Sequence, residues 1–351
     1  MPSPNGHGPV MADVARLAGV SHQTVSRVLN GHPNVRDATR ERVRAAIEEL
    51  GYRRNSSARA LVTRRTNVLG VIAVDTTLYG PASTLFGLEQ AARAAGYFVS
   101  IVSLKSGDTV SLAPAIGYLA EQSIEGLVLI TPKRVTAESL AALPETLPVV
   151  AVEGGQAPDI PVVCVDQFTG AVTATRHLLD LGHRTVWHVS GPAGWLEAEG
   201  RIQGWRSALR AAGAAAPDPV PGDWTPRSGY AAGLRLARDP EVTAVFVAND
   251  QMALGVLRAF SEAGVRVPDD VSVVGFDDIP EAEFFTPPLT TVWQDFTQVG
   301  ERSIEVLLEQ IDGAAGRGGD PARVVVPTRL AVRASTARAA RSRRDQGGTR
   351  Q

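Results

Sequence analysis

The sequence predicts an N-terminal three-helix, helix-turn-helix module followed by an α/β domain of two lobes, each with a doubly wound parallel sheet. Helical periodicity across residues 11–52, interrupted by a short glycine-containing turn, predicts the first module. From Thr66 onward, apolar strands alternate with helices, as in repeated βα units. These units form two successive series, so a chain of 351 residues fits two lobes plus the small first module.

The first module begins with a short helix and a tight turn. The apolar face of this helix is expected to comprise Ala12, Val14, Ala15, Leu17 and Ala18. Gly19 and Val20 form the turn, and the Ser21 hydroxyl is placed to cap a second helix. The inward-pointing side chains of that second helix are expected to be Val25, Val28 and Leu29.

The outer face of the second helix carries hydrogen-bonding side chains. They are His22, Gln23, Ser26 and Arg27. Such side chains can reach base edges and phosphates in a DNA major groove. An ordinary three-helix bundle with a solvated polar face is the alternative. The charge favours DNA: residues 1–66 hold 11 Arg and 5 acidic residues, a net +6, whereas the whole chain carries −2.

The segment DVARLAGVSHQTVSRVLNG resembles the DNA-binding headpiece of the LacI/GalR family of bacterial repressors. The resemblance implies that His22 and Gln23 read bases and that Arg27 contacts a base or the backbone. The full set of implied contacts in this module is Ser21, His22, Gln23, Thr24, Ser26, Arg27 and Asn30. His22 stands where a family member has tyrosine, so its operator base is expected to differ.

Residues 53–65 read as a basic linker in which Asn55 and Ser56 can cap a short helix over 57–61. Composition alone fits a flexible linker equally well. In the resembling family this hinge helix folds in the minor groove, where a leucine enters a base step. Leu61, preceded by Ala58 and Ala60, matches that leucine. The resemblance thus adds Asn55, Ala58 and Leu61 to the DNA contacts.

The α/β part is expected to start with a continuous apolar strand, of the kind buried on both faces of a parallel sheet. The predicted strands are 67–74, 97–103, 126–130, 149–153, 162–166, 185–191, 244–250 and 271–277, with two closing strands in 324–336. The predicted helices are 82–95, 111–121, 137–143, 167–181, 197–212, 226–238, 251–263 and 298–311. The segment TTVWQDF lies between the second lobe and the last helix.

The resembling family shares the fold of periplasmic sugar-binding proteins, which implies that the chain crosses between the lobes three times. These crossings are expected near 164–167, 292–296 and 321–325. The first lobe is then expected to hold about 66–165 and 295–322, and the second about 166–294 and 323–337. Both lobes are therefore discontinuous in sequence.

A ligand is expected between the lobes, because open α/β sheets bind ligands outside the carboxyl ends of their strands. The polar residues at predicted strand ends are Asp75, Glu153, Asn249, Asp250 and Asp277. Carboxylates and amides suit a polyhydroxylated ligand, since they accept hydrogen bonds from sugar hydroxyls. Trp224 and Phe296 could add apolar surfaces for a sugar ring, although core packing is the usual role of a buried aromatic.

The segments WLEAEGRIQGW, GDW, VANDQMALG, SVVGFDD and TTVWQDF also look like segments of the same family. The resemblance implies that Arg201 holds sugar hydroxyls and that Trp224 contacts the sugar ring. Tyr79 and Gly80 depart from the family's apolar wall, and Glu153 replaces an aspartate. The implied ligand-binding residues are Leu78, Pro81, Glu153, Arg201, Trp224, Asn249, Asp277 and Phe296.

Other chemistry finds little support in the sequence. The phosphate-binding pattern G-x-x-x-x-G-K-[ST], the dinucleotide pattern G-x-G-x-x-G and the hydrolase pattern G-x-S-x-G are missing. Cys164, the single cysteine, is expected in a buried strand, and His183 and His188 are expected to be structural. We therefore expect no cofactor, no metal and no enzymatic activity.

Both ends of the chain are expected to be disordered, over residues 1–10 and 338–351. The start lacks the apolar stretch of a signal peptide, and no run of about 18 apolar residues could span a membrane, so a cytoplasmic protein is expected. The basic tail has no leucine heptad, which favours a homodimer over a tetramer.

These features predict a transcriptional repressor of carbohydrate-use genes that binds double-stranded operator DNA. A saccharide resembling a galactoside is expected to bind between the lobes and release the protein from its operator. One alternative is a corepressed regulator of the same family. From other classes, the alternatives are a sugar-binding transport protein and a glycosidase-like enzyme.

Overall fold

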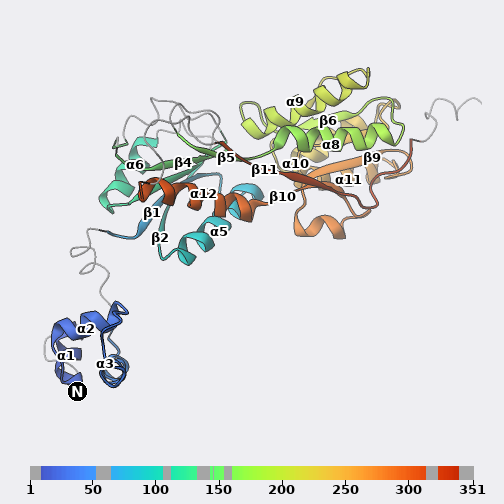
Figure 1. Ribbon diagram of the computed structural model, residues 1–351. Helices are drawn as coiled ribbons and strands as arrows, with labels where there is room; N and C mark the ends of the chain where they lie inside the picture. Colours follow the sequence, from blue (N-terminus) through green and yellow to red (C-terminus); the bar gives the residue numbers. More distant parts are fainter. Residues whose placement is uncertain are drawn as a thin grey trace, which may run out of the picture. The chain divides into compact units, whose positions relative to one another are not determined.

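The computed structural model describes residues 9–52, 65–105, 112–132, 143–144, 146–153, 160–313 and 323–339. The chain divides into two compact units, residues 1–66 and residues 67–351 (Figure 1). The predicted hinge helix, the predicted helix 137–143 and the tail beyond residue 339 lie outside the described residues.

The N-terminal unit contains the three predicted helices: α1 (Met11–Ala18), α2 (His22–Leu29) and α3 (Asp37–Leu50). The prediction for Ser21 is confirmed, because its hydroxyl accepts a hydrogen bond from the Thr24 amide at 3.2 Å and caps α2. Gly19 ends α1 in the left-handed conformation, which glycine adopts without a steric penalty. The turn between the first two helices is therefore built as predicted.

One part of the predicted apolar face is wrong. Val14, Ala15 and Ala18 are buried, but Ala12 is exposed and Leu17 is 45% exposed. The buried positions follow the helical spacing of 3 to 4 residues from Met11, and Leu17 falls outside that stripe. On α2, Val25 and Val28 are buried and Leu29 packs partly against them, as predicted.

The first lobe contains a six-stranded sheet in the order β11-β5-β4-β3-β1-β2, and its paired strands are parallel. Its strands are β1 (Val68–Val74), β2 (Phe98–Leu104), β3 (Gly126–Ile130), β4 (Val149–Val152), β5 (Val162–Val165) and β11 (Arg323–Val326). Val71 packs in a core with α5 (Tyr79–Ala94) and α12 (Phe296–Ile311), whereas Ile72 packs in a core with α6 (Leu112–Glu121). Alternate residues of a strand thus face helices on opposite sides of the sheet.

The second lobe repeats this plan with the order β12-β10-β9-β8-β6-β7. Its strands are β6 (Trp187–Ser190), β7 (Val220–Pro221), β8 (Ala244–Val247), β9 (Ser272–Asp277), β10 (Thr290–Gln294) and β12 (Thr328–Ala331). Its helices are α8 (Gln167–Asp180), α9 (Leu196–Ala211), α10 (Pro226–Leu236) and α11 (Asp250–Glu262), with a 3-10 helix at Pro280–Phe284. Only β12 among the paired strands runs antiparallel. The predicted two-lobed, doubly wound fold is confirmed.

The chain passes between the two sheets three times, and the positions of these passages refine the predicted ones. The first falls between β5 and α8, and the second between β10 and α12, both where predicted. The third lies at Pro327, between β11 and β12. The expectation of 321–325 is therefore wrong by a few residues, and 323–326 belong to the first lobe, because β11 pairs with β5.

Several elements differ from their predicted bounds. The helix predicted from residue 82 begins at Tyr79, and TTVWQDF contributes the inner strand β10 instead of a connection. The short strand β7 and the 3-10 helix had no periodic signal in the sequence. None of the helices in the described ranges is both long and apolar enough to cross a membrane.

Pairs of helices on the sheets approach each other through glycine. A Cβ added at Gly255 of α11 would lie 2.0 Å from the Pro226 carbonyl oxygen, and one at Gly229 of α10 would lie 2.1 Å from the Met252 carbonyl oxygen. Gly87 of α5 and Gly300 of α12 meet the facing backbone in the same way. These contacts involve backbone atoms, so no side chain can move aside to admit a methyl group.

We expect Gly255→Ala to lower the free energy of unfolding of the α/β unit by about 1–3 kcal/mol, because overpacking forces the two helices apart. Gly117→Ala in α6 is the matched control, since a Cβ there meets nothing within 4 Å. The control should be neutral or stabilising by about 0.5–1 kcal/mol. Chemical denaturation of both variants measures the difference, and equal stabilities would contradict the packing argument.

Candidate functional site

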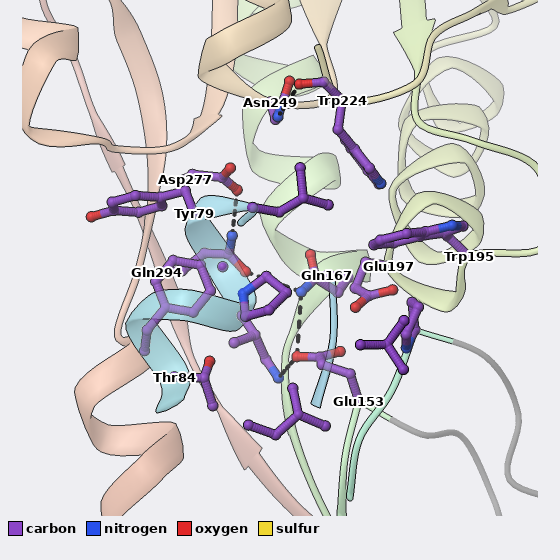
Figure 2. A pocket seen from close by; sticks show the side chains of 18 of the residues that line it. Tyr79, Thr84, Glu153, Gln167, Trp195, Glu197, Trp224, Asn249, Asp277 and Gln294 are labelled. Atoms are coloured by element: carbon purple, nitrogen blue, oxygen red, sulfur yellow. Dashed lines mark hydrogen bonds between the residues drawn. The ribbon is translucent and has the colours of Figure 1, made fainter. Parts of the chain in front are cut away.

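A cavity of about 260 Å³ lies between the two lobes at the carboxyl ends of their strands (Figure 2). All eight residues that the sequence implied as ligand-binding line this single cavity: Leu78, Pro81, Glu153, Arg201, Trp224, Asn249, Asp277 and Phe296. Leu78, Pro81 and Phe296 come from the N-terminal ends of α5 and α12 in the first lobe. Arg201 comes from the second turn of α9 in the other lobe. Their ligand-binding roles stay a prediction.

Three of the lining residues hold backbone conformations that side chains rarely adopt. Glu153 has φ 59°, Trp224 has φ 71° and Asp277 has φ 111°. Each lies where the chain leaves a strand or approaches a helix. Such left-handed non-glycine residues cost free energy and gather at functional sites. Here the three residues are two carboxylic acids and a tryptophan, and all three line one cavity.

Two of the five predicted strand-end residues are not in the cavity lining. Asp250 is fully buried: its Oδ1 accepts a hydrogen bond from the Thr291 hydroxyl at 2.6 Å, and its Oδ2 accepts one from the Ile279 amide at 2.9 Å. It holds β10 and the start of the 3-10 segment in place. Asp75 is absent from the lining as well. Successive residues at a strand end point in opposite directions, so adjacency to a strand does not decide which side chain faces a ligand.

Arg201 occupies the centre of a buried polar network. Its Nε donates a hydrogen bond to Gln167 Oε1 at 2.8 Å, and its Nη1 donates to the Ala248 carbonyl. Its Nη2 lies 3.5 Å from Asp277 Oδ1, and its guanidinium stacks over the Phe276 ring at 3.9 Å. The Arg201 side chain therefore has a fixed orientation before any ligand arrives.

Gln167 and Gln294 extend this network across the passages between the lobes. Gln167 Nε2 donates to Gln294 Oε1 at 3.0 Å and to Glu153 Oε1 at 3.5 Å. Gln294 Nε2 donates to Asp277 Oδ1 at 2.6 Å. Glu153 Oε1 also accepts a hydrogen bond from the Val165 amide at 2.7 Å. Figure 2 shows these bonds joining the two sides of the cavity.

Burial disfavours the ionised carboxyl groups of the cavity. Desolvation raises the pKa of Glu197 to about 8, with the charge of Glu153 as a further cause. Desolvation also raises the pKa of Glu153 to about 7 and that of Asp277 to about 6, although hydrogen bonds and Arg201 oppose the increase. The cavity can thus present protonated carboxyls, which donate as well as accept hydrogen bonds.

Several lining residues were missed at the sequence level: Thr84, Thr131, Gln167, Trp195, Glu197, Gln251 and Gln294. Gln294 is the last residue of β10, so the strand-end argument would have found it had TTVWQDF been predicted as a strand. Gln167 directly follows the first passage between the lobes. Trp195 is the N-cap residue of α9, and Glu197 is the second residue of that helix. No pattern in the sequence shows that this helix start faces the cavity.

Trp224 lies against Gly191. A Cβ at Gly191 would lie 2.2 Å from the Trp224 ring, so only glycine leaves room for the indole there. Asn249 fixes the same loop: its Nδ2 donates to the Trp224 carbonyl at 3.2 Å, while its Oδ1 caps α11 by accepting from the Met252 amide. The Asn249 amide is therefore largely engaged within the protein.

The predicted DNA-contacting side chains lie together on α2 and its cap. Ser21, His22, Gln23, Arg27 and Asn30 are exposed, while Thr24 and Ser26 are partly exposed. Thr24 shares a hydrogen bond with the Ser21 hydroxyl at 2.9 Å, and Asn30 Nδ2 donates to Ser26 at 3.4 Å. Asn55, Ala58 and Leu61 lie outside the described residues.

The remaining candidate groups, Cys164, His183 and His188, do not line the cavity. Cys164 is buried in β5, and burial raises the pKa of its thiol to about 11. His188 is buried against Trp205 and Phe246, and burial lowers its pKa to about 4. His183 bonds Thr243 and Ser272. The described segments contain no group of three potential metal ligands.

A helix-turn-helix module joined to a two-lobed α/β domain with a central cavity is the architecture of a DNA-binding regulator. Residues 10–55 match the model for bacterial regulatory proteins of the lacI family, and residues 175–336 match the periplasmic binding protein-like domain. The chain belongs to the LacI family.

Relatives along nearly the whole chain support this assignment. HTH-type transcriptional regulator CelR of Thermobifida fusca is 37% identical over 340 residues, which cover 93% of this chain and 98% of CelR. The lactose operon repressor of Escherichia coli strain K12 is 32% identical over 326 residues, covering 92% and 89%.

Solved structures agree. The Lac repressor dimer bound to operator and the anti-inducer ONPF matches with a TM-score of 0.83 and 31% identity, covering 94% of this chain and all of that one. A CelR–cellobiose complex matches with a TM-score of 0.68 and 34% identity, covering 93% and 99%.

The raised pKa of Glu197 predicts a pH-dependent stability. The raised pKa keeps the Glu197 carboxyl protonated in the folded cavity up to about pH 8, whereas a solvated glutamate has an ordinary pKa of 4.5 and loses its proton near that pH. The stability from this group is full at low pH and is lost as pH rises toward 8. We expect the melting temperature of Glu197→Gln, relative to wild type, to increase between pH 5 and 8 and then level off. A constant difference would contradict a protonated Glu197.

Proposed function

We propose that this chain is a repressor whose binding to operator DNA is controlled by a saccharide held between the two lobes. Membership of the LacI family makes it a DNA-binding transcriptional regulator. The observation that supports a saccharide is the cavity itself, where carboxyl, amide and guanidinium groups alternate with aromatic rings. Sugars combine hydroxyl groups with apolar ring faces, so they fit this mixture of polar and aromatic surfaces.

The cavity contacts support this ligand class in detail. Arg201 and Asp277 are held by the protein at one edge, with Phe296 and Tyr79 packed edge to face at 5.7 Å nearby. Trp224 closes another side, 5.4 Å from the Arg201 guanidinium carbon. The CelR relative was solved with cellobiose, a sugar. A galactoside-like effector is the narrower proposal, and it rests on the sequence resemblance alone.

We also propose a homodimer that reads a pseudo-palindromic operator through its two α2 helices. Large apolar side chains are exposed on the first lobe: Phe86, Phe98, Ile101 and Tyr118. Phe98 and Ile101 lie on β2, which ends the order of the first sheet, and Phe98 is 68% exposed. An apolar sheet edge of this kind favours association with another copy. The lactose repressor relative was solved as a dimer on its operator.

Control by the saccharide requires that it bind one arrangement of the lobes more tightly than the other. The passages at 165–167, 294–296 and 326–328 are the connections about which the lobes could rotate. In the proposed mechanism, closure of the lobes on the saccharide rearranges the dimer, which then releases its operator. Residues such as Asn55, Ala58 and Leu61 would lose their DNA contacts in that state. That the chain is cytoplasmic and not an enzyme stays a prediction.

If Gln23 on α2 reads a base, replacing it should weaken binding to the specific operator more than binding to unrelated DNA. Selection from a random DNA library should yield pseudo-palindromic sites, and Gln23→Ala should weaken binding to them about tenfold, because one base contact is worth ~1–3 kcal/mol. Binding to unrelated DNA should change little. Arg93→Ala, which removes an exposed arginine of the other unit, is the control. Equal losses on selected and unrelated DNA would contradict base reading by Gln23.

If a saccharide controls operator binding, adding the right saccharide should release the protein from its operator. Titrating glucosides and galactosides into the protein–operator complex should weaken operator binding at least tenfold for the right saccharide. Asp277→Asn should bind operator normally but respond poorly, because it alters the carboxyl beside Arg201. Asp269→Asn, an exposed carboxyl outside the cavity, is the control. Tighter operator binding with sugar would favour the corepressed alternative, and no response across a broad panel would overturn the effector proposal.

A further inference from the structure

Two polar atoms in the cavity have no hydrogen-bond partner in the described part of the chain. They are Glu197 Oε2 and Trp224 Nε1, and both atoms are buried. Trp224 as a whole is only 6% exposed. A buried donor or acceptor left unpaired costs free energy, so such atoms need a partner from outside the protein. Glu153, Gln167, Gln294, Asp277 and Arg201 are joined to one another by hydrogen bonds and an ion pair, which sets these two atoms apart.

Both atoms belong to one side of the cavity. The Trp195 and Trp224 rings meet edge to face with centroids 5.6 Å apart, and Glu197 follows Trp195 at the start of α9. Figure 2 shows Trp195 and Glu197 opposite Tyr79 and Gln294, with the Trp224 nitrogen directed toward the Trp195 side. The Trp195 side therefore has aromatic surfaces together with unpaired polar atoms.

The opposite side has a separate aromatic pair with its own polar groups. Tyr79 and Phe296 meet edge to face there, and Asp277 lies at the end of β9 with Gln294 bonded to it. A pyranose ring needs an apolar surface for its C–H face and polar groups for its hydroxyls. The cavity has an aromatic pair with nearby polar groups on the Tyr79–Phe296 side and another on the Trp195–Trp224 side.

We propose that the cavity takes a disaccharide and that Trp195, Trp224 and Glu197 form the subsite for its second sugar ring. In this subsite Glu197 Oε2 hydrogen-bonds a ring substituent, and the Trp224 indole N–H donates to a saccharide oxygen. Arg201, Asp277 and Phe296 hold the first ring. This inference rests on the proposed saccharide function and specifies its ligand class.

The electrostatics of the subsite agree with a neutral ligand. Burial raises the pKa of the Glu197 carboxyl, so the protonated group can donate a hydrogen bond without placing a bare charge in the cavity. Arg201 donates to Gln167 and Ala248 and pairs with Asp277, whereas Glu197 Oε2 has no hydrogen bond in the described part of the chain. A sugar hydroxyl or glycosidic oxygen supplies that partner.

Calorimetric titration of the full chain with cellobiose, lactose, glucose and galactose tests the inference. We expect a disaccharide to bind at least tenfold more tightly than its own monosaccharides. Glu197→Ala should weaken disaccharide binding about tenfold, the loss of one buried hydrogen bond, and leave monosaccharide binding within about twofold. Glu197→Gln keeps two hydrogen-bonding atoms and should retain most of the affinity. Glu199→Ala removes a carboxyl from the same helix turn outside the cavity and is the matched control.

Melting temperatures of the variants establish that each is folded. Equal binding of monosaccharides and disaccharides by wild type would overturn the second subsite. So would a Glu197→Ala loss that is the same for both sugar classes, or no loss at all. If wild type binds none of a broad set of mono- and disaccharides, the proposed saccharide function fails instead, and this outcome is distinct from the other two.

Discussion

The hydrogen bond between the Gln167 and Gln294 side chains joins two of the three segments through which the chain passes between the lobes. Gln167 follows the first passage and Gln294 precedes the second, and their amides meet at 3.0 Å. Through these amides, Arg201 and Asp277 of one lobe are connected to Glu153 of the other. Both glutamines are buried, so a ligand that disturbs either one must rearrange the entire network. The side chains that line the cavity and the first two passages between the lobes are thus held by the same hydrogen bonds.

Much of this architecture could be predicted from the sequence because apolar strands and glycine turns are local signals. The strand GLVLI and the Ser21 cap needed no tertiary information. Which strand-end side chains face the cavity could not be derived in this way: Asp250 turns into the protein, whereas Asp277 faces the cavity. The strand-end argument supplied Glu153, Asn249 and Asp277, the aromatic candidates were Trp224 and Phe296, and resemblance to a family completed the set of eight lining residues with Leu78, Pro81 and Arg201. It did not supply Glu197 or Trp195, which only the three-dimensional cavity brings together with Trp224.

The N-terminal unit and the α/β unit differ in the kind of side chain that each exposes and buries. The headpiece is small, and its exposed α2 face is polar, so its affinity for DNA depends on charge and on a few hydrogen bonds. The α/β unit has large apolar cores on both faces of each sheet, and its buried carboxyl groups Glu153, Glu197 and Asp277 line the cavity. Burial raises the pKa of Glu197, so this carboxyl lowers the stability of the α/β unit at high pH.

The glycine contacts between helices separate two kinds of position in the α/β unit. Gly87, Gly229 and Gly255 leave no room for a methyl group against the facing backbone, so a larger residue at any of them would push the two paired helices apart. The residues Leu78, Thr131 and Glu197 line the cavity instead. A substitution there changes the surface that a bound molecule would meet and leaves the glycine contacts between the helices in place.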